Sequence, residues 1–204
     1  MTSVTVPTGP SLRERKKIRT RRDIRRAALR LFEAQGYDGT TVERIAEAAE
    51  VSASTVFRYF PTKEDIVLSD DHDPVMEAEL RARPAQEPVV ASLRHALLCP
   101  LRGILADEGA LEELRQRLRL VRSVPAVRTR MGERIREAGR LLASVTAERL
   151  GRPDDDLEVR VVVAAVMGAW SEAVFHWLDS DGTADPGAVL DRSLELLAAG
   201  LRRR

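Results

Sequence analysis

The chain has 204 residues, of which 44% are apolar and only 4% aromatic, a composition that favours an all-α fold of one domain or of a small and a larger one. Its single cysteine excludes an intrachain disulfide framework, its three histidines leave little material for a metal site, and no run approaches the roughly 20 apolar residues that span a bilayer. The charges behind the net charge of +1 are unevenly distributed along the chain. Residues 12–63 carry 13 basic and 7 acidic side chains, whereas residues 64–204 carry 20 basic and 25 acidic ones. A polyanion such as nucleic acid is therefore expected to bind at one end only.

Residues 1–11 have no charge and no periodicity, and we interpret them as a disordered arm without the features of a signal peptide, in a cytoplasmic protein with no membrane partner. Ser11 is a candidate N-cap for a helix over 12–35 that ends at Gly36. Its predicted buried face consists of Ile24, Ala27, Ala28, Leu31 and Phe32. The basic run from Arg13 to Lys17, extended through Arg22, is open to two interpretations: a solvated helix face, or a DNA-binding arm.

A short second helix is predicted from Thr40 or Thr41, with Val42, Ile45, Ala46 and Ala49 facing inward. Ser52 then caps a third helix, Ala53 to Tyr59, for which we expect Val56, Phe57 and Phe60 to face the core. Pro61 and Thr62 end that helix and cap a fourth that begins at Lys63. Two short helices with small residues at their crossing are the packing unit of a helix-turn-helix, whose second helix fits the major groove of DNA.

These residues resemble the DNA-binding domain of the TetR family of bacterial regulators over about residues 20–68. The resemblance rests on an ordered series that comprises Leu31-Phe32, Gly36-Tyr37, Thr40-Thr41-Val42, Ile45-Ala46, Val51-Ser52, and Phe57-Arg58-Tyr59-Phe60 ahead of Lys63-Glu64. One position departs from the usual helix-turn-helix pattern. Glu50 stands where Gly is common, because a left-handed backbone is easiest without a side chain, and it is expected to cost about 1 kcal/mol.

The outward face of the third helix supplies the candidates for reading bases: Ala53, Ser54, Thr55, Arg58 and Tyr59, with Ser52 as the cap. Thr41 lies at a helix N-terminus, where backbone N–H groups favour a phosphate, and Arg44 is placed to reach backbone or base. The resemblance implies that Tyr59 and Lys63 lie against phosphates.

Beyond an acidic junction over 70–88, the periodicity predicts a short helix near 75–83 and longer helices over 89–105, 108–122, 126–150, 157–178 and 186–201. Pro100 is expected to kink the first of these longer helices. The run Asp70-Asp71-His72-Asp73 has the residue types of metal ligands, but we interpret it as solvated linker and expect no metal or cofactor.

The last two helices carry the signs of a homodimer interface. The segment from Val161 to Trp170 is apolar nearly all round, and a leucine seam recurs at Leu190, Leu194, Leu197 and Leu201. The resemblance implies a four-helix bundle across a two-fold axis. Two recognition helices about 34 Å apart would then read a palindromic double-stranded DNA operator.

The resemblance also implies an effector-binding and dimerisation domain, here residues 70–204, after a DNA-binding domain of residues 12–69. The candidate lining residues for a small, lipophilic effector such as an acyl-coenzyme A are His95, Cys99, Arg102, Met131, Met167, Trp170 and Phe175, each of which can also be plain core.

The expected function is a ligand-responsive regulator, by default a repressor released from its operator by the effector. A transcriptional activator of the same fold and a helical interaction protein that binds DNA without sequence preference are the alternatives. An enzyme is not expected, because we find no nucleophile elbow, glycine-rich phosphate loop, Cys/His metal spacing or paired carboxylates in an apolar setting.

Overall fold

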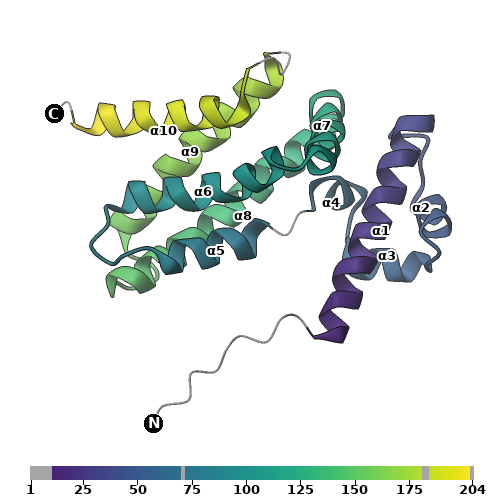
Figure 1. The fold of residues 1–204 in the computed structure, drawn as a ribbon, viewed down its shortest axis with the longest axis horizontal. Helices are drawn as coiled ribbons and strands as arrows, with labels where there is room; N and C mark the ends of the chain where they lie inside the picture. The colour runs from purple at the N-terminus through teal and green to yellow at the C-terminus, as the bar shows by residue number, and fades with distance from the viewer. Residues whose placement is uncertain (1–10, 70–71, 181–183, 203–204) are drawn as a thin grey trace, which may run out of the picture. The chain divides into compact units, whose positions relative to one another are not determined.

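A computed structural model of the chain describes residues 11–69, 72–180 and 184–202, and every regular element in these ranges is a helix (Figure 1). The all-α fold class is therefore confirmed. The chain divides into two compact units between Ser69 and Asp70, called here the N-terminal unit and the C-terminal unit. The expected disordered arm lies outside the described residues except for Ser11, as do Asp70 and Asp71 of the acidic run.

The N-terminal unit consists of α1 (Leu12–Gln35), α2 (Val42–Ala48), α3 (Ala53–Tyr59) and α4 (Lys63–Leu68). Each of these helices begins with a hydroxyl side chain that accepts a hydrogen bond from a backbone N–H group of the first turn. The caps are Ser11, Thr41, Ser52 and Thr62. Gly36 ends α1, and its N–H donates to the carbonyl of Phe32 at 3.0 Å.

The core of the N-terminal unit forms where α2 and α4 pack on α1 and α3 packs on α2. Its buried apolar side chains are Ile24, Ala27, Ala28, Leu29, Phe32, Tyr37, Ile45, Ala46, Val56, Phe60, Ile66, Val67 and Leu68. The prediction for Leu31 was wrong, since Leu31 is only half-buried and Leu29 is buried instead. The reason is that α4 also covers α1, and Arg25, one turn before Leu29, donates to the carbonyl of Ser69 at 3.1 Å.

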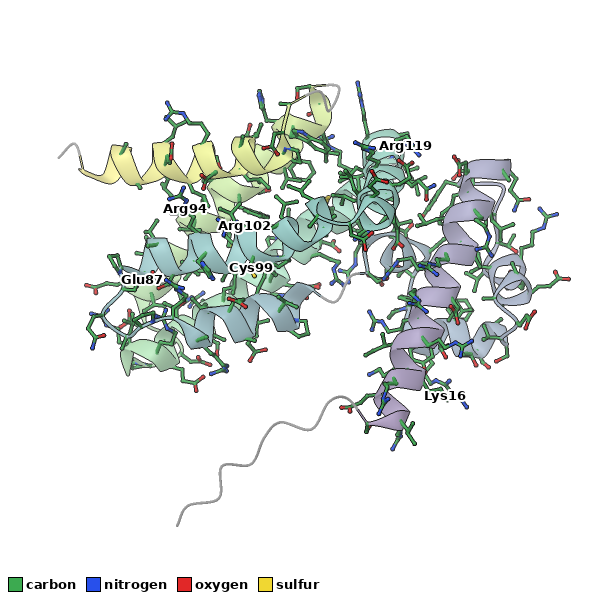
Figure 2. The ribbon with its side chains drawn as sticks, viewed as in Figure 1. Lys16, Glu87, Arg94, Cys99, Arg102 and Arg119 are labelled. Carbon is green, nitrogen blue, oxygen red and sulfur yellow. The ribbon has the colours of Figure 1, made fainter. Side chains whose placement is uncertain are left out.

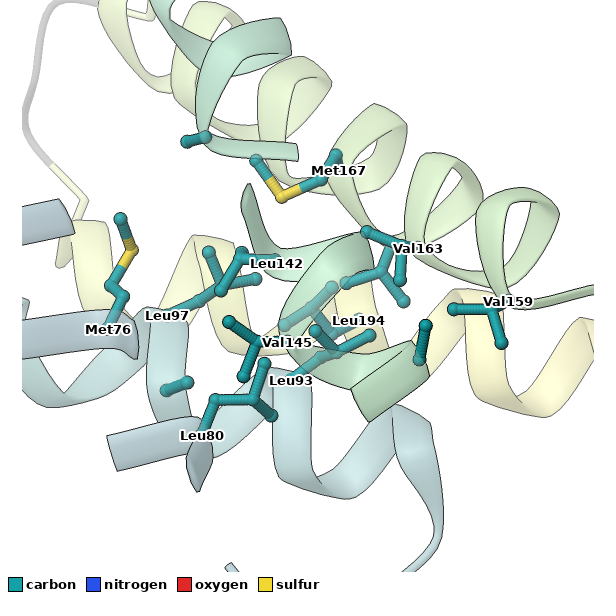
Figure 3. Close-up of a cluster of buried hydrophobic side chains, with 14 residues drawn as sticks. Met76, Leu80, Leu93, Leu97, Leu142, Val145, Val159, Val163, Met167 and Leu194 are labelled. Atoms are coloured by element: carbon teal, nitrogen blue, oxygen red, sulfur yellow. The ribbon is translucent and has the colours of Figure 1, made fainter. Parts of the chain in front are cut away.

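The C-terminal unit consists of α5 (His72–Ala82), α6 (Val89–Leu105), α7 (Glu108–Ser123), α8 (Pro125–Leu150), α9 (Leu157–Asp179) and α10 (Pro186–Arg202). Helix α9 packs against α6, α7, α8 and α10. Figure 3 shows the main apolar cluster, to which α5, α6, α8, α9 and α10 all contribute. Helix α6 continues through Pro100 as one helix.

The leucine seam of α10 packs inside this chain. Leu190 and Leu194 are buried, Leu197 is half-buried, and the side chain of Leu201 lies outside the described residues. For Leu190 and Leu194, the interpretation of the seam as a partner-facing surface was therefore wrong. Within the described residues, the large apolar side chains that α9 and α10 expose are Leu157, Val161 and Leu196, each more than half exposed.

Helix α9 is the most apolar long helix in the described part of the chain. An 18-residue window of it has a mean hydropathy of 1.5, so by length and composition alone it could cross a membrane, contrary to the expectation from the sequence. Only 28% of that window is buried within this chain. It packs against four other helices, which is the position of the core helix of a helical unit with one side left uncovered.

Candidate nucleic-acid interface

Helices α2 and α3 are joined by a tight turn in which Glu50 has a left-handed backbone, with φ of 54°. The N–H of Glu50 donates to the carbonyl of Glu47 at 3.0 Å and that of Val51 to the carbonyl of Ala46 at 2.9 Å. These two bonds satisfy the end of α2 as a helix C-terminus requires. The strained position predicted from the sequence is therefore present.

The buried residues of the two helices fix their crossing. Ile45 and Ala46 on α2 meet the rest of the core together with Val56 on α3, and all three are buried. The small side chain of Ala46 lets the helices approach closely. The opposite side of α3 is left to solvent, as direct readout in a major groove requires.

On this outward side, Ser54 and Arg58 are exposed, and Ala53, Thr55 and Tyr59 are half-buried. The guanidinium of Arg58 lies 5.2 Å from the centre of the Tyr59 ring, an arrangement that restricts the arginine and leaves its donors available. The Ser52 hydroxyl lies 2.9 Å from the hydroxyls of both Ser54 and Thr55. The predicted readers therefore form one polar surface on α3.

Thr41 and Arg44 are exposed at the start of α2. The Thr41 hydroxyl accepts from the N–H of Arg44 at 3.4 Å, and the Arg44 guanidinium donates to the side-chain oxygen of Gln35 at 2.7 Å. The anion-favouring end of α2 thus carries a cation that is tethered to the end of α1.

Lys63 has a structural role that the sequence did not reveal. Its ammonium donates to the carbonyls of Tyr37 at 2.8 Å and Thr40 at 3.1 Å, and it lies 4.1 Å from the centre of the Tyr37 ring. The Tyr37 hydroxyl donates to Glu64 at 2.8 Å, and burial together with this carboxylate raises the pKa of Tyr37. Since an ammonium has three N–H donors, one remains for a phosphate.

Phe57 is a surface residue of α3, where we expected it in the core. Its side chain is 50% exposed, whereas Phe60 is 2% exposed. Val56 and Phe60, four residues apart, occupy the inward side of the short helix, and the next position, Phe57, is rotated by about 100° from Val56. An exposed aromatic ring on a recognition helix can contact the methyl group of thymine, so Phe57 joins the candidate readers.

The described contacts divide the candidate effector residues among several places. His95 and Cys99 lie one turn apart on α6, and the His95 imidazole is 3.0 Å from the Glu79 carboxylate of α5. Burial, and to a smaller extent the negative charge of Glu79, raise the pKa of Cys99 (Figure 2). Arg102 is exposed. No group of His, Cys, Asp and Glu within the described ranges is arranged to hold a metal ion.

The other candidates lie on α8 and α9. Met167 is buried in the main apolar cluster, and Trp170 packs against both this cluster and a smaller one around Leu98. The Arg128 guanidinium lies over the Phe175 ring, 4.7 Å from the ring centre. Met131 is half-buried. Trp170 bridges these two apolar clusters of described residues, which a sequence pattern does not show.

Two family descriptions match the chain. "Bacterial regulatory proteins, tetR family" matches residues 24–69, and "MftR C-terminal domain" matches residues 87–202. The HTH-type transcriptional regulator TcmR of Streptomyces glaucescens is 40% identical over 166 residues, which cover 78% of this chain and 73% of TcmR. The fatty acid metabolism regulator protein of Bacillus subtilis is 27% identical, with 87% and 93% covered.

Among solved structures, the chain is similar to FadR of Thermus thermophilus, described as a TetR family transcriptional repressor in complex with lauroyl-CoA. The TM-score is 0.54 and the identity 27%, with 90% of this chain and 96% of FadR covered. The similarity extends across both units.

Proposed function

This chain belongs to the TetR family of bacterial transcriptional regulators, and from that premise we propose that it is a repressor that binds a palindromic operator as a homodimer and is released by a lipophilic effector. In this proposal residues 12–69 read the DNA, and residues 70–204 bind the effector and the second copy. Its place of action is the cytoplasm, where bacterial DNA lies.

The observation that carries the proposal is the outward side of α3. Ser54, Phe57 and Arg58 are exposed on a helix whose other side is anchored by Val56 and Phe60. These residue types supply a hydroxyl, an apolar surface and a guanidinium, which are the groups that distinguish base pairs in the major groove. A lone basic surface would contain no such mixture.

Selection from a random DNA library with the purified full-length protein tests the operator. We expect a palindrome bound at least about 10³-fold more tightly than scrambled DNA at physiological salt. Equal affinities for the selected and scrambled sites would contradict sequence-specific regulation and favour a helical protein that binds any DNA.

Substitutions on α3 test which of its side chains recognise the bases of the operator. Arg58→Ala is expected to relax the preference at one base pair of each half-site by about 1–3 kcal/mol, and Phe57→Ala to reduce discrimination at a thymine. Arg30→Ala is the control, since Arg30 is exposed on α1 and the change in charge is the same as for Arg58. A loss of preference as large in the control would mean that α3 is not the reader.

The homodimer proposal is supported by the uncovered side of α9 and by the exposed Leu196 of α10. On α9, Leu157 and Val161 are followed by Ala164, Ala165 and Gly168, all exposed. Small side chains at these positions allow two helices to approach closely. A second copy of the chain would cover this surface, as the apolar composition of α9 requires.

Gly168 and Gly103 provide a matched test of this interface. At both positions a Cβ atom would meet nothing within 4 Å in the described part of the chain, and both glycines are exposed within helices. Gly168→Arg is expected to yield monomers in sedimentation and to weaken operator binding by about 100-fold or more, since one half-site binds weakly. Gly103→Arg on α6 should remain dimeric. If both variants were dimeric, the dimer interface would not include the surface around Gly168.

The effector proposal is supported by apolar side chains that the C-terminal unit leaves uncovered. On α7 Val121 is buried, but Leu111, Leu114 and Leu118 remain partly exposed although α7 packs against α6, α8 and α9. The FadR structure similar to this chain is described in complex with lauroyl-CoA. We therefore propose an acyl-coenzyme A, with Trp170 as the central contact and His95, Cys99, Arg102, Met131, Met167 and Phe175 as the further candidates.

Tryptophan fluorescence tests this ligand class. The chain has two tryptophans, so Trp177→Phe leaves Trp170 as the only reporter. Lauroyl-CoA is expected to change the Trp170 emission and to release the operator, whereas coenzyme A alone should do neither. An unchanged emission together with an intact operator complex would reject acyl-coenzyme A while leaving operator binding in place.

A further inference from the structure

The first turns of α1 project from the N-terminal unit. All side chains from Leu12 to Arg19 are exposed, and the first buried residue is Ile24, about 18 Å along the helix axis from Leu12. The tetR family match begins at residue 24, so these turns precede the part that the chain shares with the family description. We call residues 12–20 the projecting turns.

Local interactions hold the projecting turns helical without support from packing. The N–H of Ser11 donates to the Glu14 carboxylate at 2.7 Å, and the N–H of Glu14 donates to the Ser11 hydroxyl at 3.3 Å. This reciprocal capping box satisfies two of the free N–H groups at the helix start. Arg19 and Asp23 add an ion pair at 3.7 Å across one turn. The side chains of the projecting turns therefore stand at fixed helical spacing.

The projecting turns are strongly basic. They contain five cations against the single acidic residue Glu14, and Figure 2 labels Lys16 among them. The five cations are Arg13, Arg15, Lys16, Lys17 and Arg19. A helix segment with this charge, whose side chains are exposed among the described residues, fits a polyanion better than an apolar partner.

One row of these cations leads toward the recognition helix. Arg13, Lys17 and Arg21 are spaced four residues apart and lie on the side of α1 that further along carries Ile24 and Ala28, the side on which the core forms. The Arg21 guanidinium lies 5.3 Å from the centre of the Phe60 ring, directly after the end of α3. The row therefore extends outward from the base of α3.

We propose that Arg13 and Lys17 bind phosphates of the duplex that flanks the bases read by α3. The inference rests on the proposed operator binding and extends its footprint. Because duplex DNA presents one phosphate per strand for each 3.4 Å or so of its axis, a row of this length meets several phosphates. Arg15, Lys16 and Arg19 lie on other sides of the helix and are not assigned this role.

Two double variants of the full-length protein test the row. Arg13→Ala/Lys17→Ala removes two cations from the core side of α1, and Arg22→Ala/Arg26→Ala removes two exposed cations from the opposite side. On the selected operator, the first variant is expected to reduce the slope of log K against log salt by about 0.9 per lost phosphate contact, or about 3 to 4 for a dimer. Its hydroxyl-radical footprint should shorten at both outer edges, with base preferences unchanged. The control should keep the wild-type slope and footprint.

The outcomes separate this inference from the proposed function. A wild-type slope and footprint for Arg13→Ala/Lys17→Ala, or an equal loss in the control, would overturn the row while operator recognition stands. Equal binding of operator and scrambled DNA by the wild-type protein would reject the proposed function itself. Circular dichroism checks that both variants fold, as expected for alanine on exposed helical positions.

Discussion

The two units of this protein fix the ends of their helices in different ways. In the N-terminal unit all four helices begin with a Ser or Thr that accepts a backbone hydrogen bond. In the C-terminal unit, α7 and α9 begin with Asp107 and Asp156, whose side chains accept such a bond, but α6 and α8 follow Pro88 and Val124, neither of which makes a side-chain cap. Short-range chemistry thus fixes every helix start around the proposed reading surface, whereas in the C-terminal unit the starts of α6 and α8 depend on packing between helices, an arrangement that a ligand can alter by filling or separating them.

The largest expected effect compares two neighbouring aromatic residues of α3. Phe60→Ala removes a buried ring and is expected to destabilise the N-terminal unit by about 3–5 kcal/mol. Phe57→Ala, at a half-exposed position, should cost much less and act on DNA binding. Both tryptophans lie in the C-terminal unit, so urea unfolding followed by fluorescence reports that unit, while circular dichroism reports both.

For Phe60→Ala we therefore expect a dichroism transition at lower urea and an unchanged fluorescence transition. A fluorescence transition that moves with the dichroism would break the comparison, because it would mean that the two units unfold together.

The caps provide a smaller test. The Thr62 hydroxyl accepts from the N–H of Asp65 at 3.1 Å and donates to its carboxylate at 2.9 Å, so Thr62→Ala is expected to destabilise the N-terminal unit by about 1 kcal/mol. Val124→Ala, at the equivalent position of α8, removes no cap and should leave hydrogen exchange at the start of α8 nearly unchanged. Similar losses at both positions would remove the distinction between the units.

This difference also explains what could be predicted from the sequence. The bounds of α1 and α3, the caps Ser11, Ser52 and Thr62, and the strained turn at Glu50 follow from local rules, and the structure agrees with each. Phe57 was misplaced because a seven-residue helix is too short for periodicity to choose between adjacent aromatic residues. The carbonyl contacts of Lys63 depend on a loop more than twenty residues earlier, which no local pattern encodes.

In the C-terminal unit the sequence predicted the helices but not their contacts. A leucine repeat such as Leu190 and Leu194 fits a partner surface as well as an internal one, and only the position of α6 and α9 decides that it is internal. The candidate effector residues spread over α6, α8 and α9 for the same reason: periodicity specifies a face of one helix and leaves open which helix covers it.

The last and smallest expected effect is a pH dependence of stability in the C-terminal unit. It arises at an ion pair that adds to the packing between the helices. In the α5–α6 connection the Arg83 guanidinium donates to the Glu87 carboxylate at 2.7 Å, as does the Ser92 hydroxyl, and these bonds lower the pKa of Glu87 from 4.5 to about 2. A carboxylate with a lowered pKa contributes stability above its unfolded pKa, and this contribution is lost as the pH falls from about 4.5 through 2. The difference in stability between wild type and Glu87→Gln should therefore be constant from pH 7 to 5 and shrink below pH 4.5, when unfolding is followed by tryptophan fluorescence. A difference as large at pH 2.5 as at pH 7 would show that Glu87 acts through its shape and hydrogen-bonding atoms, and it would place the α5–α6 connection with the charge-independent packing of the rest of the unit.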